Sequence, residues 1–136
     1  MTDLFIDTDV IIDFIIDRQP FSKDAARLFT LIDRKKVKGY TSALCYSNLY
    51  YILSKYEAHK KLITMLNELT ELVGILKVDD DIIKDSLASG YSDFEDAVQM
   101  MSATQIGAQY LVTRNIKDYK SGPLPVVQPT ELLALL

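Results

Sequence analysis

One segment near the amino terminus constrains the fold of this chain more than any other. It consists of an apolar run at residues 4–6, the polar triplet Asp7-Thr8-Asp9, and a second, mostly apolar run at residues 10–16. The first run predicts a short buried strand and the second predicts a helix. In an open α/β sheet, ligands bind at the carboxyl ends of the strands, and Asp7 lies at such an end. A carboxylate there requires a partner, because burying an unpaired charge is costly.

Short strand patterns alternate with longer helical patterns along the whole chain. Strands are predicted at residues 3–7, 39–41, 74–78, 110–113 and 125–127, and helices at residues 10–16, 20–32, 42–56, 60–72, 79–88, 94–106 and 131–136, the last capped by Thr130. This alternation indicates βαβ crossovers and a mainly parallel sheet of four or five strands with helices on both faces. We therefore predict a single α/β domain over residues 1–136, although the pattern does not fix the strand order.

The composition excludes several classes of protein. Hydrophobic residues make up 49% and charged residues 25% of the chain, as expected for a globular domain with a core. We find neither a membrane-length apolar run nor a signal-peptide pattern, and one cysteine excludes an internal disulfide and a cysteine zinc site. We therefore expect a cytoplasmic protein outside the membrane. The net charge of −4 argues against nucleic-acid binding through bulk charge, unless converging acids hold cations.

The first acidic cluster, at residues 7–9, has two interpretations. The first interpretation is that Asp9 or Thr8 only caps the following helix through a side-chain oxygen, and the second is that the cluster has a function. A cap at Asp9 leaves Asp7 unexplained at the strand end, so we favour a functional role for Asp7. Asp13, one turn further on, is expected to be solvated or to have a minor supporting role.

The second cluster extends from Ser92 to Asp96 at the start of the helix predicted at residues 94–106. Ser92 and Glu95 match the capping box S-x-x-E, which explains these two residues without a function. The capping box does not explain Asp96. This residue lies in the first turn of a helix that must bury one face, and it can either serve the helix end or point into a cleft.

The third cluster, at residues 113–118, follows the strand predicted at residues 110–113. Asn115 and Asp118 either form a local turn or contribute to a site. Arg114 and Lys117 flank the acidic edge, where one interpretation is that they position a phosphate. Because parallel strands end at one edge of a sheet, the three clusters are predicted to meet there.

Carboxylates brought together in this way repel one another. Two unit charges about 4 Å apart repel by about 4 kcal/mol at an effective dielectric constant of about 20. A protein keeps such a cluster by protonating some members or by binding a cation. The clusters contain no cysteine or histidine, and oxygen ligands favour Mg²⁺ or Mn²⁺ over zinc. These ions also bind phosphates and activate water.

Three segments together resemble the PIN-domain family, which includes the VapC toxins of prokaryotic toxin–antitoxin pairs. The segments are Ile6-Asp7-Thr8-Asp9-Val10, Asp93-Phe94-Glu95-Asp96-Ala97 and Val112-Thr113-Arg114-Asn115-Ile116-Lys117-Asp118-Tyr119. The resemblance covers essentially the whole chain and implies a Rossmann-like, three-layer α/β/α fold. It also implies an Mg²⁺- or Mn²⁺-dependent endoribonuclease that cleaves RNA and acts as a toxin. The implied partners are an antitoxin protein and a second copy of the chain in a homodimer.

The resemblance assigns roles to the residues of the clusters. Asp7, Asp96 and Asp118 would be catalytic and would hold the metal ion. Supporting roles are predicted for Asn48, Thr113, Asn115, Asp9 and Asp93. The bound ion would lower the pKa of a water molecule and stabilise charge on the phosphate, and hydrolysis would leave a 5′-phosphate and a 3′-hydroxyl.

One position departs from the family pattern. Asn48 lies where the family usually has a glutamate, so that the chain resembles a subgroup with asparagine there. Asparagine is a neutral oxygen donor that can bind a metal or its water but cannot act as a base, and the missing negative charge predicts weaker Mg²⁺ binding. The alternative function is therefore a catalytically weak or inactive PIN-like module that binds RNA or protein.

A third hypothesis is a phosphoacceptor receiver domain, which also has acids at the end of its first strand. Asp79 follows the strand predicted at residues 74–78, but no suitable lysine follows the last strand. We rank this hypothesis last. His59, the only histidine, is expected at the surface between two helices rather than in a catalytic triad.

Overall fold

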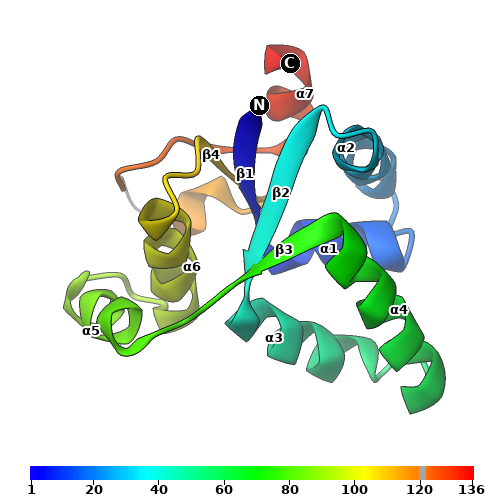
Figure 1. Cartoon of the computed structure of the whole chain (residues 1–136), viewed down its shortest axis with the longest axis horizontal. Helices are drawn as coiled ribbons and strands as arrows, with labels where there is room; N and C mark the ends of the chain where they lie inside the picture. Colours follow the sequence, from blue (N-terminus) through cyan, green and yellow to red (C-terminus); the bar gives the residue numbers. More distant parts are fainter. Residues whose placement is uncertain (120–121) are drawn as a thin grey trace.

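In the computed structural model, which describes residues 1–119 and 122–136, a five-stranded parallel sheet lies between helices (Figure 1). The elements are β1 (Thr2–Ile6), α1 (Thr8–Ile15), α2 (Ser22–Asp33), β2 (Val37–Ser42), α3 (Ala43–Leu53), α4 (His59–Leu72), β3 (Val73–Leu76), α5 (Asp80–Ala88), α6 (Phe94–Gln105), β4 (Tyr110–Val112), the 3₁₀ helix η1 (Ile116–Asp118), β5 (Val126–Val127) and α7 (Pro129–Leu135). The strand order is β3-β2-β1-β4-β5. The predicted α/β class and parallel sheet are confirmed.

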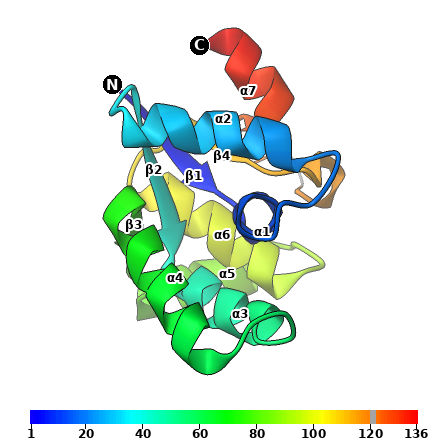
Figure 2. The same cartoon turned by 90° about the vertical axis from the view of Figure 1, so that its right-hand side faces the viewer.

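The central strand β1 contributes to two separate cores. Leu4 and Ile6 pack in the core beneath α1, α2 and α4, whereas Phe5 packs in the opposite core with Met100 and Ala103 of α6. Successive side chains of a strand point to opposite faces, so a strand covered on both faces is apolar throughout. Figure 1 shows α5 and α6 on one side of the sheet, and Figure 2 turns the layer of α1, α2 and α4 toward the viewer.

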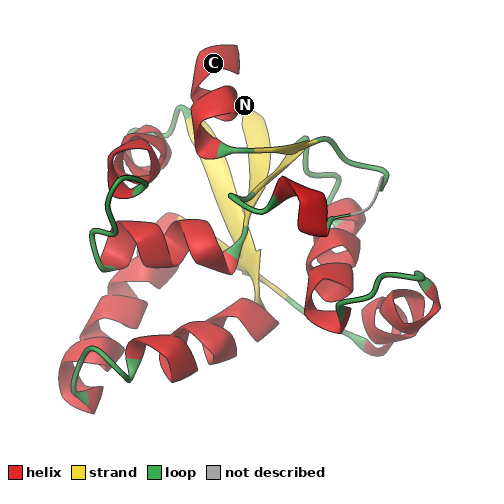
Figure 3. Ribbon diagram, turned by 180° about the vertical axis from the view of Figure 1, so that it is seen from behind, coloured by secondary structure: helices red, strands yellow, loops and turns green. Residues whose placement is uncertain are grey.

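The helices and the edge strands are short (Figure 3). The longest helix of the described residues, α4, has 14 residues. Within residues 1–119 and 122–136, none of the helices combines the length and the apolar character that crossing a bilayer requires. The edge strands β3 and β5 have four and two residues, and short edge strands offer little unpaired backbone to another chain.

Two helices, α1 and α6, begin at residues other than the predicted caps. Asp7 is the N-cap of α1, and its carboxylate accepts a hydrogen bond from the next backbone N–H. The prediction of a cap at Asp9 or Thr8 is therefore wrong. Asp93, rather than Ser92, is the N-cap of α6. Each segment offers several cap residues within three positions, and the path of the incoming chain selects among them.

The last helix, α7, also begins earlier than predicted. Gln128 is its N-cap and forms a capping box with Glu131, so the prediction of a cap at Thr130 is wrong. The Thr130 hydroxyl instead donates a hydrogen bond to the carboxylate of Asp24 in α2, at 2.8 Å. This contact helps to hold α7 against α2.

Gly39 in β2 is a position where an added Cβ would collide with the ends of two buried isoleucine side chains. A Cβ there would lie 2.8 Å from Cδ1 of Ile32 and 2.9 Å from Cδ1 of Ile6. We expect Gly39→Ala to lower the free energy of unfolding by about 1–3 kcal/mol, because both isoleucines would have to leave their packed positions. Chemical denaturation measures this change. Lys38→Ala, at the exposed neighbouring position, is the control and should change stability by less than about 0.5 kcal/mol; equal effects of the two substitutions would contradict the prediction.

Candidate functional site

Asp7 lies at the carboxyl edge of the sheet, directly after the central strand. Its backbone N–H donates to the carbonyl of Val112 at 2.9 Å, which extends the pairing of β1 with β4 by one residue. The residue is only 8% exposed. Burial raises the pKa of its carboxyl group above the ordinary value, because a charge is poorly solvated in this position.

Four neutral groups donate hydrogen bonds to the Asp7 carboxylate. Its Oδ1 accepts from the backbone N–H of Thr8 at 2.7 Å and from Nε2 of Gln99 at 3.4 Å. Its Oδ2 accepts from the hydroxyl groups of Thr113 and Tyr119, both at 2.9 Å. These bonds lower the pKa of Asp7, but burial has the larger, opposite effect. The carboxylate is thus fixed in orientation without being neutralised by these donors.

Asp9 faces the segment that follows β4. Its Oδ2 accepts hydrogen bonds from the backbone N–H of Arg114 and from Nδ2 of Asn115, both at 3.1 Å. It also lies 3.2 Å from Thr113 Oγ1, whose single proton is shared between Asp9 and Asp7. Burial, followed by the negative charge of Asp7, raises the pKa of Asp9 to about 6. Asp9 therefore joins α1 to the third cluster and places a second carboxylate near Asp7.

The first turn of α6 brings further carboxylates to the same edge. Asp93 accepts a hydrogen bond from the backbone N–H of Asp96 at 3.0 Å. The pKa of Asp96 is raised to about 7, first by burial and then by the negative charges of Asp93, Asp7, Asp118 and Glu95. The structure thus brings Asp7, Asp96 and Asp118 close enough for their charges to interact across three elements.

The chemistry of this donor set suits a hard divalent cation. The side chains are carboxylates without histidine or cysteine ligands, which is the set that Mg²⁺ and Mn²⁺ prefer. Burial raises the pKa values of Asp9 and Asp96 most, and the negative charges of neighbouring carboxylates raise them further. In the described part of the chain, however, no three His, Cys, Asp or Glu side chains are grouped so as to hold an ion. Binding would therefore require the carboxylates to adjust.

Glu95 is a carboxylate of the site that sequence analysis assigned to helix capping. Burial, followed by the negative charge of Asp7, raises its pKa, and the side chain of Asn48 lowers it. Among the described residues, the buried Nδ2 of Asn48 has no partner in hydrogen-bonding geometry, so the two side chains are neighbours without a formed bond. The capping interpretation is wrong because Asp93 caps α6. A carboxylate consequently lies beside Asn48, near the position where the family pattern expects one.

Arg114 forms an ion pair within the protein. Its guanidinium donates to both oxygens of Asp13 through Nε and Nη2, and its Cζ lies 4.0 Å from the ring centroid of Phe21. Asp13 is 1% exposed and also lies 3.7 Å from Nε of Arg18. The expectation that Asp13 is solvated is therefore wrong, because an arginine far along the chain neutralises it. A phosphate-positioning role stays a prediction for Arg114 and for Lys117, which is exposed in η1.

Two side chains that contact Asp7 were not predicted from the sequence. Gln99 is fully buried on α6, and the only signal was a glutamine among apolar residues, one turn after Asp96. Tyr119 is 7% exposed and resembles an ordinary core residue in the sequence. Burial and the negative charge of Asp7 raise the pKa of Tyr119, so its hydroxyl keeps the proton that it donates.

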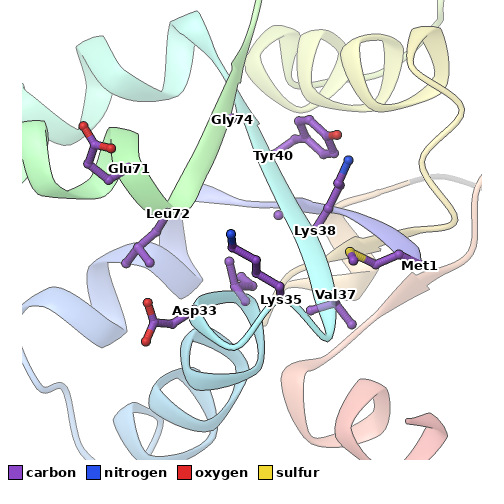
Figure 4. Close-up of a pocket in the computed structure, with 11 residues that line it drawn as sticks. Met1, Asp33, Lys35, Val37, Lys38, Tyr40, Glu71, Leu72 and Gly74 are labelled. Carbon is purple, nitrogen blue, oxygen red and sulfur yellow. The ribbon is translucent and has the colours of Figure 1, made fainter.

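A pocket of about 430 Å³ lies at the other end of the sheet, near the amino-terminal ends of β1 and β2 (Figure 4). Lys35 and Lys38 bring amino groups to it, and Asp33 and Glu71 bring carboxylates. The strands run from this pocket toward Asp7, so the pocket does not belong to the acidic site.

Solved structures show the same fold at low sequence identity. The chain is similar to VapBC2 from Rickettsia felis bound to a promoter DNA fragment, with a TM-score of 0.72 and 16% identity over 93% of this chain and 98% of that one. A toxin–antitoxin complex from Klebsiella pneumoniae gives a TM-score of 0.71 and 22% identity over 93% and 97%. VapC20 from Mycobacterium tuberculosis, a sarcin–ricin loop cleaving toxin, gives 0.64 and 17% over 79% and 86%.

Sequence comparisons give two further findings. No curated protein matches the chain. The family model of the PIN domain matches residues 3–117, a range that contains most of β1, the first turn of α6 and most of the segment after β4. All the carboxylates of the acidic site except Asp118 lie within it. Because this match extends over most of the sequence, the chain belongs to the PIN domain family.

Proposed function

We propose that this protein is an Mg²⁺- or Mn²⁺-dependent endoribonuclease and the toxin of a toxin–antitoxin pair. The observation that carries the proposal is the convergence of carboxylates from β1, α6 and η1, whose mutual repulsion contributes to raising the pKa of Asp96 to about 7. Membership of the PIN domain family supports it. The similar folds of a sarcin–ricin loop cleaving toxin and of toxin–antitoxin complexes point in the same direction.

In this proposal, Asp7, Asp96 and Asp118 hold the ion. When bound, the ion supplies the positive charge that lowers the pKa of a water molecule and stabilises the phosphate. Asp7 is oriented for this purpose by hydrogen bonds from Thr113 and Tyr119. Supporting residues are Asp9, Asp93, Asn115 and Asn48.

The RNA backbone requires positive charge beside the acidic edge. Arg114 and Lys117 flank this edge, and we propose that they position phosphates of the RNA. Phosphodiester hydrolysis would leave a 5′-phosphate and a 3′-hydroxyl. The partners in this proposal are an antitoxin protein and a second copy of the chain, and the compartment is the cytoplasm.

An alternative function is motivated by Asn48, which would place the chain in a PIN subgroup with asparagine at this position. With one ligand charge fewer, the protein would be a weak nuclease or a module that only binds RNA or protein. Calorimetric titration with Mn²⁺ separates the two functions. RNA binding that persists in chelator, without Mn²⁺ binding at millimolar concentration, favours the binding module.

We expect the purified protein to cleave RNA with Mg²⁺ or Mn²⁺ and to lose this activity in EDTA. Asp7→Asn should reduce cleavage more than about a hundredfold, because loss of supporting contacts alone typically costs 10–100-fold. Gel analysis of end-labelled RNA measures the rate. Glu71→Gln, an acid at the opposite end of the sheet, is the control and should cleave like the wild type. Cleavage that survives in Asp7→Asn or in EDTA would contradict the metal mechanism.

A further inference from the structure

Gln99 connects three elements beneath the acidic edge. It is completely buried on α6, and its side-chain amide lies between Asp7, Ser42 and Cys45. Its Oε1 accepts a hydrogen bond from Ser42 Oγ at 2.9 Å. Its Nε2 donates to Asp7 Oδ1 at 3.4 Å and to Cys45 Sγ at 2.7 Å. A fully buried amide with partners for both of its ends is a polar network inside an otherwise apolar core.

Asp7 and Ser42 together fix the orientation of this amide. The Asp7 carboxylate can only accept hydrogen bonds, so the NH₂ end of Gln99 faces it. The Oγ of Ser42 then donates its proton to Oε1 of Gln99 and accepts a hydrogen bond from the backbone N–H of Cys45 at 3.2 Å. A reversed amide would place its oxygen against the Asp7 oxygen, where two acceptors face each other without a proton between them.

We propose that Ser42 and Gln99 are a pair of positioning residues that hold the Asp7 carboxylate in its metal-binding orientation. The proposal rests on the proposed nuclease function and deepens it. Thr113 and Tyr119 hold Oδ2 of Asp7 from the side of the segment after β4, and Gln99 is the side chain that holds Oδ1 from α6. Groups that orient a metal ligand contribute strongly to affinity although they do not touch the metal.

The position of Gln99 on α6 adds to this argument. Asp96 lies in the first turn of the helix and Gln99 lies one turn further into the core. One rigid helix therefore sets both a carboxylate of the site and the amide that orients another. Sites built on rigid elements hold their geometry better than sites built on loops.

The test is a calorimetric titration of the purified full chain with Mn²⁺ alone. We expect Gln99→Met, which keeps the length of the side chain but removes the donor, to weaken Mn²⁺ binding about tenfold or more. Ser42→Ala should also weaken it, whereas Ser42→Thr keeps the hydroxyl and should restore the wild-type affinity. In the Gln99→Met background, Ser42→Ala should cause no further loss, because Ser42 acts through the amide.

Ser102→Ala is the matched control. Ser102 is buried on the same helix, and its hydroxyl has no hydrogen-bond partner among the described residues. This variant should bind Mn²⁺ like the wild type. Affinity in Gln99→Met within twofold of the wild type would overturn the proposal, and so would additive losses in the double variant. Absence of Mn²⁺ binding in the wild type itself would overturn the proposed function as well, so the two failures are distinct.

A measurement on the wild type decides the case if Gln99→Met does not fold. In ¹⁵N NMR spectra, the side-chain NH₂ of Gln99 should exchange slowly with solvent and shift on addition of Mg²⁺. In Ser42→Ala it should exchange faster, since the amide then loses the hydrogen bond that holds its oxygen. Two results would overturn the proposal. One is exchange of the wild-type Gln99 NH₂ as fast as that of exposed glutamines. The other is an unchanged Gln99 NH₂ signal when Mg²⁺ shifts the signals of other residues and is therefore bound.

Discussion

Asp96→Asn is expected to abolish RNA cleavage and, at the same time, to stabilise the metal-free protein. The negative charges of Asp93, Asp7, Asp118 and Glu95 contribute to raising the pKa of Asp96, so the ionised carboxylate is repelled by its surroundings. Asparagine removes the charge while keeping nearly the same shape. Activity should fall more than about a hundredfold, because even supporting residues of metal sites are worth 10–100-fold.

The expected gain in stability is modest because Asp96 is only half-buried. Solvent screening limits it to roughly 1 kcal/mol or less. Thermal denaturation at neutral pH in EDTA measures the gain, and added Mg²⁺ should reverse the order by stabilising only the wild type. Glu68→Gln, at an exposed acid in α4, is the control and should leave the stability unchanged. A loss of stability of Asp96→Asn in EDTA would show that repulsion does not dominate at this position.

Arg114→Ala should lower the free energy of unfolding by about 3 kcal/mol, since removing one partner of a buried ion pair leaves an uncompensated charge. The charge left behind is Asp13, which is 1% exposed. Arg18 Nε, 3.7 Å from Asp13, compensates only in part. The variant also loses the contact of the guanidinium with the Phe21 ring, which adds to the effect.

Denaturant titration measures the change, and two further variants test its cause. Lys117→Ala, at an exposed position after the same strand, should change stability by less than about 0.5 kcal/mol. Asp13→Asn combined with Arg114→Ala should be more stable than Arg114→Ala alone, because the unpaired charge is then absent. If the double variant is the less stable one, packing of the arginine rather than its charge explains the loss.

The fold class was predictable from the sequence because its signal is local. Each strand is a short apolar run, and each helix has its own periodic pattern, so the alternation implies a parallel sheet. The strand order β3-β2-β1-β4-β5 was not predictable, since it depends on pairings between distant segments. Asp7 was identified because a carboxylate at the end of an apolar run is conspicuous without knowledge of its neighbours.

The remaining parts of the site depend on contacts that a sequence pattern does not contain. Gln99 and Tyr119 reach Asp7 from 92 and 112 residues away, and Arg114 reaches Asp13 from 101 residues away. Nothing near either position indicates these partners. Glu95 was misassigned for a local reason, because the capping box and the acidic cluster overlap in the sequence and only the backbone shows which residue caps the helix.

The central position of β1 has a consequence for the order of folding. The strand is synthesised before its two neighbours in the sheet, β2 and β4, and β4 begins only at Tyr110. The hydroxyl groups that orient Asp7 come from residues 106 and 112 positions later. Contacts of such long range form late in folding because closing the intervening loop costs entropy. A nascent chain would therefore carry no assembled acidic site until Tyr119 has left the ribosome.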